Sequence, residues 1–441
     1  MRVPGTGRTI GGRAGDPFRP RRVAMLSVHT SPLDRPGGGD AGGMNVYVLH
    51  LAKQLARLDV EVEIFTRATS SRSVPVVEAC PGVTVRHVET GPGRQPTKES
   101  LSARLHRFAS AVLRVEAAHG RGHYDMVHSH YWLSGQVGGV VAEHWGVPLV
   151  HSMHTMAKVK NLALAAGDEP EPPAREAGEE GVVSASDLLI ANADDEAHQL
   201  VRLYGADPDQ VATVWPGVDL ATFTPGRRQR ARARLGLAPD AVVLLYAGRI
   251  QPLKAPDVLI RAAARLLAVR PQLRSRLLVP VVGGPSGNGL ARPHGLVDLA
   301  RELRVDDVVR FHPPVEQSVL ADWYRAADLT VVPSYNESFG LVALESQACG
   351  TPVLASSVGG LRTAVADGVS GVLLADHEPD TWARTMGELI DDPARMRRLQ
   401  SGAVAHASRF GWDATAASTL DAYAVACERR RAEFFEAVTC R

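Results

Sequence analysis

Two successive series of short apolar runs, each alternating with longer amphipathic segments, span most of this sequence of 441 residues. The short runs are rich in valine, leucine and isoleucine, which favours strands, and the longer segments repeat apolar residues with helical spacing. Strands that alternate with helices build a mostly parallel sheet with helices on both faces. The sequence therefore predicts an α/β fold with two doubly wound domains.

The two series are separated by a stretch that breaks the alternation. The first series of predicted strands lies at 22–30, 61–68, 83–90, 126–132, 148–155 and 188–193, and the second at 241–250, 277–286, 308–315, 329–337, 351–360 and 371–378. Between them, residues 211–226 contain two proline-glycine pairs, which are typical of a loop. We therefore predict Rossmann-like domains at 22–217 and 218–405, with ligands bound in the cleft at the carboxyl ends of their strands.

The chain ends are expected to lie outside these two domains. Residues 1–21 are rich in arginine, glycine and proline and lack the apolar block of a secretory signal, which predicts a disordered tail. Helices at 406–430 are expected to pack back on the N-terminal domain, and residues 431–441 are expected to form a tail.

Composition limits the partners of the protein. The formal net charge is +1, so no overall field favours nucleic acid or an anionic membrane surface. No apolar run approaches the roughly 18 residues of a membrane span. The four cysteines (Cys80, Cys349, Cys427 and Cys440) form no C-x-x-C pair, which indicates free thiols of a reducing compartment. We expect a cytoplasmic protein.

A glycine-rich loop follows the first predicted strand. Residues 37–42 satisfy G-x-G-x-x-G, the pattern of dinucleotide-binding proteins. However, seven residues (30–36) separate the strand from this pattern, and the second strand has no acidic residue at its end. A plain glycine-rich connection is the other interpretation. We favour a loop whose backbone N–H groups approach a bound ligand at the start of the helix near Gly43.

The segment PSYNESFGLVALESQACGTP (333–352) predicts a strand end, a loop and a helix. Ser338 is the predicted N-cap, so Glu337 is expected in the loop at the mouth of the cleft and Glu345 about two turns into the helix. The N–H groups of residues 339–341 would then bind an anion. The alternative is a surface helix with two solvated glutamates.

Two cations are predicted to face the same cleft. Arg249 follows the strand at 241–248, and Lys254 lies five residues later. Both can bind a diphosphate, the arginine as a fork and the lysine as a point charge. Together with the two glutamates, this pattern predicts a sugar-nucleotide site. Ribose would bind Glu345 and hexose hydroxyls would bind Glu337.

These residues resemble the donor site of retaining GT-B glycosyltransferases, the group that includes sucrose-phosphate synthases, and the resemblance extends from Arg22 to about residue 425. More narrowly, segments 29–49, 128–138, 283–287 and 336–345 resemble D-inositol-3-phosphate glycosyltransferases. This family opens mycothiol biosynthesis by transferring GlcNAc from UDP-GlcNAc to 1D-myo-inositol 3-phosphate with retention of configuration.

The resemblance implies the residues of each part of the site. Those for the acceptor are His29, Lys98, Tyr131, Thr155 and Arg175. Those for the donor are Arg35, Pro36, Asp40, Ala41, Gly42, Gly43, Met44, Asn45, Arg249, Lys254, Val315, Glu337 and Glu345. Catalysis would use Glu337, His154, Arg249 and Lys254. A structural Mg²⁺, not required for the chemistry, would be held by main-chain oxygens at Tyr324, Arg325, Ala327 and Thr351.

Other interpretations stay open on sequence alone. Another retaining transferase, such as a sucrose-phosphate or mannosyl transferase, would share the fold. A nucleotide-binding regulator and a sugar-nucleotide epimerase belong to different classes. His128 is expected to be a satisfied core histidine, and His130 could be one too. The resemblance also implies a homodimer.

Overall fold

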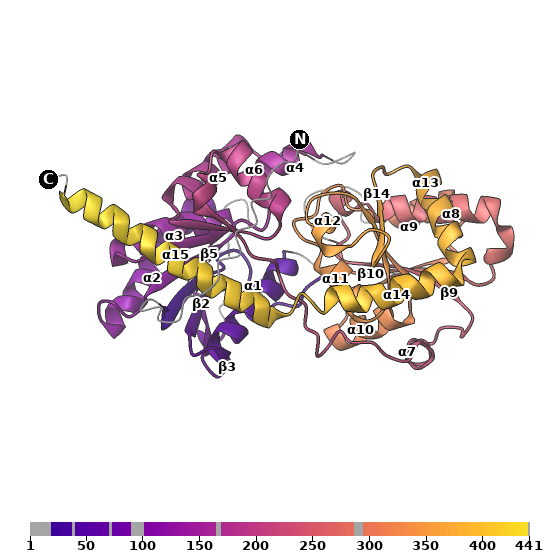
Figure 1. The fold of residues 1–441 in the computed structure, drawn as a ribbon, viewed down its shortest axis with the longest axis horizontal. Coiled ribbons are helices and arrows are strands. Elements are labelled where there is room, and N and C mark those ends of the chain that lie inside the picture. Colours follow the sequence, from indigo (N-terminus) through magenta and orange to yellow (C-terminus); the bar gives the residue numbers. More distant parts are fainter. Residues whose placement is uncertain are drawn as a thin grey trace.

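The computed structural model describes residues 19–37, 40–69, 73–89, 101–164, 169–285 and 294–439. It forms two α/β domains side by side, each built on one sheet, as the sequence predicts (Figure 1). Of the predicted N-terminal tail, residues 1–18 lie outside the described residues.

The N-terminal domain contains an eight-stranded sheet of order β3-β4-β2-β1-β5-β6-β7-β8, parallel except for β3. Its strands are β1 (Arg22–Leu26), β2 (Glu61–Arg67), β3 (Val76–Cys80), β4 (Val83–Val88), β5 (Met126–His130), β6 (Leu149–Ser152), β7 (Leu188–Ala191) and β8 (Val211–Thr213). Its α-helices are α1 (Gly43–Arg57), α2 (Leu105–His119), α3 (Trp132–Trp145), α4 (Ala157–Leu162), α5 (Pro173–Ala185) and α6 (Asp194–Tyr204). The strand order changes direction at β1 and β5, which opens a crevice at their carboxyl ends.

The C-terminal domain contains a six-stranded parallel sheet of order β11-β10-β9-β12-β13-β14. Its strands are β9 (Val242–Ala247), β10 (Leu277–Val282), β11 (Val309–His312), β12 (Leu329–Val332), β13 (Val353–Ser356) and β14 (Gly371–Leu374). Its α-helices are α7 (Arg228–Leu235), α8 (Pro256–Val269), α9 (Gly295–Glu302), α10 (Gln317–Ala326), α11 (Leu341–Ala348), α12 (Leu361–Ala364), α13 (Pro379–Asp391) and α14 (Pro393–Ala407).

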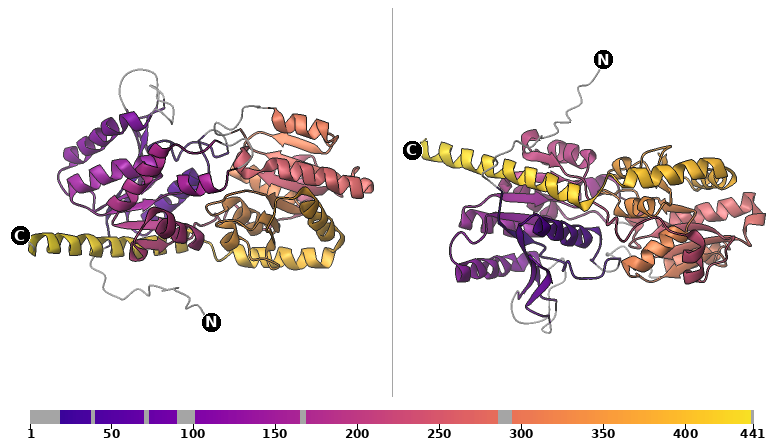
Figure 2. Two further views of the ribbon diagram at one scale, coloured as in Figure 1. Left: turned by 90° about the horizontal axis from the view of Figure 1, so that it is seen from above. Right: turned by 60° about the horizontal axis from the view of Figure 1, so that its bottom comes forward.

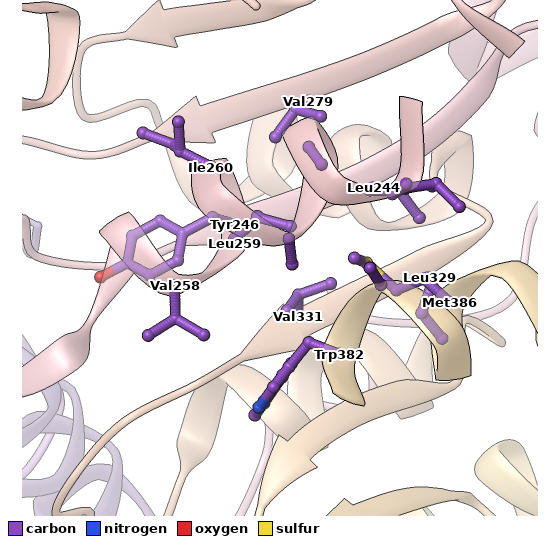
Figure 3. Close-up of a cluster of buried hydrophobic side chains, with 14 of the residues drawn as sticks. Leu244, Tyr246, Val258, Leu259, Ile260, Val279, Leu329, Val331, Trp382 and Met386 are labelled. Atoms are coloured by element: carbon purple, nitrogen blue, oxygen red, sulfur yellow. The ribbon is translucent and has the colours of Figure 1, made fainter. Parts of the chain in front are cut away.

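Branched side chains of the central strands fill the core of the second domain. Leu244 on β9 and Val331 on β12 pack against Leu259 on α8 and Trp382 on α13 (Figure 3). Because both faces of this sheet are covered, its strands are apolar almost throughout, which is why the sequence showed them as short continuous runs. The core thus holds the carboxyl ends of β9 and β12 beside each other.

The last helix, α15 (Trp412–Thr439), returns from the second domain and packs on α1, β6 and β7 of the first (Figures 1 and 2). The return to the N-terminal domain was expected, but the predicted tail from residue 431 is wrong because the helix continues to Thr439. None of the helices in the described part of the chain is both long and apolar enough to span a membrane.

Candidate active site

A cavity of about 320 Å³ lies between the two domains, at the carboxyl ends of their strands. Residues from both domains line it. The lining includes these residues implied by the resemblance: His29, Arg35, Pro36, Asp40, Gly42, Gly43, Met44, Tyr131, His154, Thr155, Arg249, Lys254, Val315, Glu337 and Glu345.

The glycine-rich loop of the first domain contacts the second domain directly. A Cβ on Gly42 would lie 3.1 Å from Arg249 Nε, and one on Gly43 would lie 3.4 Å from Leu341 Cδ1. The main chain also bridges the domains, since Gly284 N donates a 2.8 Å hydrogen bond to Gly37 O. Glycines therefore allow this loop to approach the cations and α11 closely.

Two residues of the implied donor set, Ala41 and Asn45, do not line the cavity. The Asn45 side chain is buried, where it accepts from Gly42 N at 2.9 Å and donates to Thr30 Oγ1 at 2.9 Å. Asn45 thus fixes the loop to the start of α1. Both ends of its carboxamide therefore form hydrogen bonds within the first domain.

A cation and a carboxylate pair in the cavity wall. Lys254 Nζ lies 2.6 Å from Glu337 Oε2, and both side chains are about four-fifths buried, with 19% and 20% exposed. Arg249 stands beside them at the end of β9. Lys254 and Arg249 thus bring two cations to the wall that carries Glu337.

The segment around Glu337 differs from the prediction in one respect. Helix α11 begins at Leu341, and its N-cap is Gly340 with a φ of 99°. A Cβ there would lie 2.7 Å from Leu361 Cδ2, so the left-handed turn requires glycine. Ser338 is therefore not the N-cap. Its hydroxyl donates to the main-chain oxygen of His154 in the other domain.

Glu345 lies one turn into α11, closer to the loop than the two turns predicted. It is 8% exposed and accepts a 2.8 Å hydrogen bond from the Tyr324 hydroxyl. Burial raises the pKa of Glu345 to about 7. The carboxyl group can therefore change its charge when a ligand supplies further donors.

His154 is neutral and fixed in orientation. Burial lowers the pKa of His154 to about 3, and its Nε2 lies 2.9 Å from His130 Nδ1. His130 Nε2 is buried without a partner among the described atoms, so a proton there would be unsatisfied. This favours the tautomers in which His130 Nδ1–H donates to His154 Nε2 and His154 keeps its own proton on Nδ1.

The histidine of β5 that the sequence assigned to the core is confirmed there. His128 is fully buried, with its two ring nitrogens 2.8 Å from Tyr423 Oη and 3.0 Å from Ser152 Oγ. A buried ring with both nitrogens bonded has no group left for a ligand. Since Tyr423 belongs to α15, this histidine instead connects the last helix to the first sheet.

The acceptor residues of the described chain form one cluster on the first domain. Arg175 Nη2 donates to Thr155 Oγ1 at 3.0 Å, and the guanidinium lies 5.1 Å from the centre of the Tyr131 ring. That ring lies 4.4 Å from the His29 ring. Arg175 stands behind the cavity wall, in ion pairs of 2.8 Å with Glu171 and Glu179. Lys98 lies outside the described residues.

Sequence reasoning missed Asn192 and Tyr47, which also line the cavity. Asn192 directly follows β7, so the rule that strand ends carry ligands could have identified it. Its Nδ2 donates to Glu196 Oε2 at 3.1 Å, which leaves the amide oxygen without a partner among the described atoms. Nothing in the pattern of α1 distinguishes Tyr47 from an ordinary core residue.

The residues implied for Mg²⁺ lie together at the end of α10. Thr351 Oγ1 is 2.6 Å from Tyr324 O and 3.5 Å from Ala327 O. Main-chain oxygens are hard ligands of the kind that Mg²⁺ accepts, so the chemistry of the implied set suits the ion. In this structure Tyr324 O accepts instead from the Thr351 hydroxyl, and Thr351 O accepts from Ser346 Oγ at 2.9 Å. Within the described ranges there is no group of three or more His, Cys, Asp or Glu side chains that could hold a metal.

Comparisons with known proteins agree with this arrangement. Residues 42–217 match the family described as Glycosyl transferase 4-like domain, and residues 227–405 match Glycosyl transferases group 1. The solved structure of sucrose-phosphate synthase from Thermosynechococcus elongatus superposes with a TM-score of 0.82 at 30% identity, over 90% of this chain and 97% of that one. The lipopolysaccharide glycosyltransferase WaaG shares the fold with a TM-score of 0.69 at 19% identity, over 90% and 98% of the two chains.

Curated relatives are more similar in sequence. D-inositol 3-phosphate glycosyltransferase 2 of Catenulispora acidiphila is 62% identical over 413 residues, which cover 94% of this chain and 97% of that protein. D-inositol 3-phosphate glycosyltransferase of Streptomyces griseus is 59% identical over 441 aligned positions, covering 96% and 93%. The chain therefore belongs to the D-inositol 3-phosphate glycosyltransferases and has the GT-B fold.

Proposed function

We propose that this glycosyltransferase transfers GlcNAc from UDP-GlcNAc to 1D-myo-inositol 3-phosphate with retention of configuration and releases UDP, the first step of mycothiol biosynthesis. The observation that carries the proposal is a single cavity with the Arg249–Lys254–Glu337 corner on one wall and the Tyr131–Thr155 cluster on the other. A doubly charged sugar nucleotide suits the first wall and a phosphorylated polyol suits the second.

The donor binds mainly to the second domain in this proposal. Its diphosphate lies against Arg249 and Lys254 and near the N-terminus of α11, where the unpaired N–H groups favour an anion. The ribose hydroxyls donate to Glu345. The hexose then lies between Glu337 and His154, because these two side chains line the cavity from opposite domains.

The acceptor binds to the first domain. Its inositol ring packs beside Tyr131 and His29, whose rings already contact each other at 4.4 Å. Its phosphate carries about −1.5 to −2 charge if it titrates like other phosphate monoesters. The Thr155 hydroxyl and the cations Lys98 and Arg175 supply donors for that phosphate.

The chemistry needs no protein nucleophile. The acceptor hydroxyl attacks the anomeric carbon on the face from which UDP leaves, and its proton passes to the departing β-phosphate oxygen. The bond from that oxygen to the anomeric carbon breaks as the new glycosidic bond forms. Arg249 and Lys254 stabilise the charge that develops on the phosphate, as preorganised electrostatic groups do. His154 orients the sugar as a neutral hydrogen-bond donor.

We also propose a structural Mg²⁺ at Tyr324, Arg325, Ala327 and Thr351, and a homodimer. The ion would connect the end of α10 to the turn before β13 and would take no part in the transfer. Added Mg²⁺ should therefore raise the melting temperature while a chelator leaves turnover unchanged. Light scattering coupled to gel filtration would test the dimer.

The decisive experiment incubates the purified protein with UDP-GlcNAc and 1D-myo-inositol 3-phosphate and identifies the product by mass. We expect one GlcNAc-inositol phosphate for each UDP released, and no product with unphosphorylated inositol. The structural likeness to sucrose-phosphate synthase makes that activity the second candidate. Transfer from UDP-glucose to fructose 6-phosphate, with none to the inositol phosphate, would favour it.

A further inference from the structure

The two walls of the cavity are joined by a hydrogen bond beside the proposed position of the sugar. The Ser338 hydroxyl, from the second domain, donates to the main-chain oxygen of His154, from the first. Both residues line the cavity. The bond therefore connects the domains where the transferred sugar would lie.

On the first domain, the carbonyl and the imidazole of His154 are held as one rigid piece. His154 has a φ of 60°, a left-handed conformation that is uncommon for a residue with a side chain. Its ring is held by His130 Nδ1 at 2.9 Å and lies edge-on to the Tyr47 ring at 5.0 Å. A strained backbone conformation that the surrounding contacts hold in place is typical of functional positions. The place of the carbonyl therefore sets the place of the imidazole.

On the second domain, Ser338 is fixed to the catalytic loop. Gly360 N donates to Glu337 O at 2.9 Å, and a Cβ on Gly360 would lie 2.4 Å from Ser338 O, so the loop lies directly on the turn before α12. Phe339 is buried against Phe410, with ring centres 5.9 Å apart. These contacts tie the loop to α12 and to Phe410, so we expect Ser338 and Glu337 to move together.

We propose that Ser338 is a positioning residue, whose hydroxyl aligns His154 with Glu337 across the donor sugar when the cleft is closed. This rests on the proposed function. The groups proposed to hold the diphosphate and the ribose, Arg249, Lys254 and Glu345, all belong to the second domain, while the glycine-rich loop of the first domain contacts the donor from the other side. Loss of the Ser338 bond should therefore impair the transfer step more than nucleotide binding, since these three groups stay together on the second domain while His154 moves away with the first.

The test compares Ser338→Ala with Ser338→Thr, which keeps a hydroxyl. We expect Ser338→Ala to lower kcat about tenfold, equivalent to about 1.4 kcal/mol of transition-state stabilisation. The Kd for UDP, measured by calorimetry, should stay within twofold, and Ser338→Thr should recover most of kcat. The matched control is Arg362→Ala, which removes another inter-domain contact, the exposed 3.1 Å ion pair with Asp195, and should leave kcat within twofold.

Domain closure gives a measurement that does not depend on turnover. Small-angle scattering with saturating UDP should show a larger radius of gyration for Ser338→Ala than for the wild type and for Arg362→Ala. If the wild type fails to glycosylate inositol phosphate, the proposed function fails while the scattering comparison still tests the alignment. An Ser338→Ala protein with wild-type kcat, with unchanged scattering, or with UDP affinity lost in proportion to kcat would overturn the inference.

Discussion

Glu337 pairs with Lys254 in the structure and is proposed to bind the donor sugar, and one substitution tests the charge on which both depend. In the ligand-free cavity its carboxylate pairs with Lys254 at 2.6 Å, and in the proposed complex it accepts from a sugar hydroxyl. Glu337→Gln keeps a hydrogen-bonding side chain of the same shape but removes the charge. We expect kcat to fall at least about 100-fold, because both the sugar contact and the placement of Lys254 depend on that charge. Steady-state kinetics would measure it, with exposed Glu302→Gln on α9 as the control. Wild-type turnover would remove Glu337 from the site.

Arg175 is proposed to bind the acceptor phosphate and is also part of a buried ion pair, and a paired substitution distinguishes the two roles. Arg175→Ala should raise the acceptor KM at least about tenfold with little change in the donor KM. It also leaves Glu179, whose side chain is 0% exposed, without its ion pair, which costs about 3–5 kcal/mol in comparable sites.

The double variant Arg175→Met with Glu179→Gln keeps side chains of similar size and leaves no unpaired charge at position 179. Its melting temperature should therefore lie above that of Arg175→Ala, while the acceptor KM stays high. Kinetics with each substrate varied in turn, beside thermal melts, would measure both effects. Equal changes in the two KM values would contradict the assignment of Arg175 to the acceptor.

Glu345 predicts a pH dependence of donor binding. Its pKa is raised to about 7 by burial, so at pH 6 it is mostly protonated and at pH 8 mostly ionised. Ribose hydroxyls donate to the ionised form, so binding lowers this pKa and releases protons. Affinity for UDP-GlcNAc should rise about tenfold from pH 6 to pH 8. The pKa of His154, about 3, keeps that ring neutral throughout the window.

Calorimetry in buffers of different ionisation enthalpy should show that about half a proton is released for each UDP-GlcNAc bound at pH 7. In Glu345→Gln this proton release and the pH dependence of the affinity should both disappear. A slope that persists in this variant would assign the titration to another group.

At the scale of secondary-structure elements, the turn before α11 determines where Glu337 lies. Gly340 has a φ of 99° and no space for a Cβ beside Leu361, whereas Gly350, after the same helix, has a φ of 86° and only ordinary contacts. Alanine at either position strains the backbone by about 1–3 kcal/mol. Only Gly340→Ala should also shift the catalytic loop and lower kcat.

Melting temperature and kcat would be measured for both variants. We expect Gly340→Ala to lose more stability than Gly350→Ala, because only its Cβ meets Leu361, and we expect Gly350→Ala to retain wild-type kcat per folded molecule. If the two variants lost the same activity, the close contact with Leu361 would have no role in placing the loop.

Elements with strong local patterns could be predicted from sequence, and those defined by their neighbours could not. The apolar run at 241–250 contains β9, and the alternation of runs and helices indicated both sheets. Strand β3 was missed because it is a short edge strand of partly exposed residues. Strand β8, with three residues, was taken as part of the boundary.

The same limit applies to the site. Arg249, Lys254 and Glu337 lie in one cavity because each lies in the segment after a strand, at the carboxyl edge of a single sheet. Glu345 joins them from one turn into the helix that follows β12. The order of elements along the chain predicts this arrangement. The partner of Ser338 could not be predicted, since His154 is 184 positions away and belongs to the other domain. Local propensity favoured a serine N-cap, and the contact across the cleft, together with Gly340, overrode it.

At the scale of the whole molecule, the chain crosses between the domains twice at the same place. Val218 N donates to Phe410 O at 2.8 Å, and Val218 forms a parallel bridge with Gly411. The two crossings lie beside each other on one side of the cleft, where α15 begins (Figure 1). Because the two connecting segments are hydrogen-bonded to each other, we expect both of them to bend together when the cleft opens.

Gly217 makes that pairing possible. A Cβ there would lie 2.6 Å from Trp412 N and 2.7 Å from Trp412 Cα, both backbone atoms that cannot rotate away. Gly217→Ala should separate the crossings, with a loss of about 1–3 kcal/mol of stability from overpacking. It should also change the angle between the domains. Gly181→Ala is the matched control, because a Cβ on that residue of α5 meets nothing within 4 Å and should be neutral or stabilising by about 0.5–1 kcal/mol.

Chemical denaturation would measure the stability of the two variants, and small-angle scattering with and without UDP would measure the angle. In Gly217→Ala the difference in radius of gyration with and without UDP should become smaller, because the two connecting segments are no longer paired and do not bend together. The proposed acceptor cluster lies on the first domain and Arg249, Lys254 and Glu345 lie on the second, so kcat should fall more than the affinity for UDP. A Gly217→Ala protein that closes on UDP as the wild type does, with the same kcat, would show that the paired crossings do not control closure.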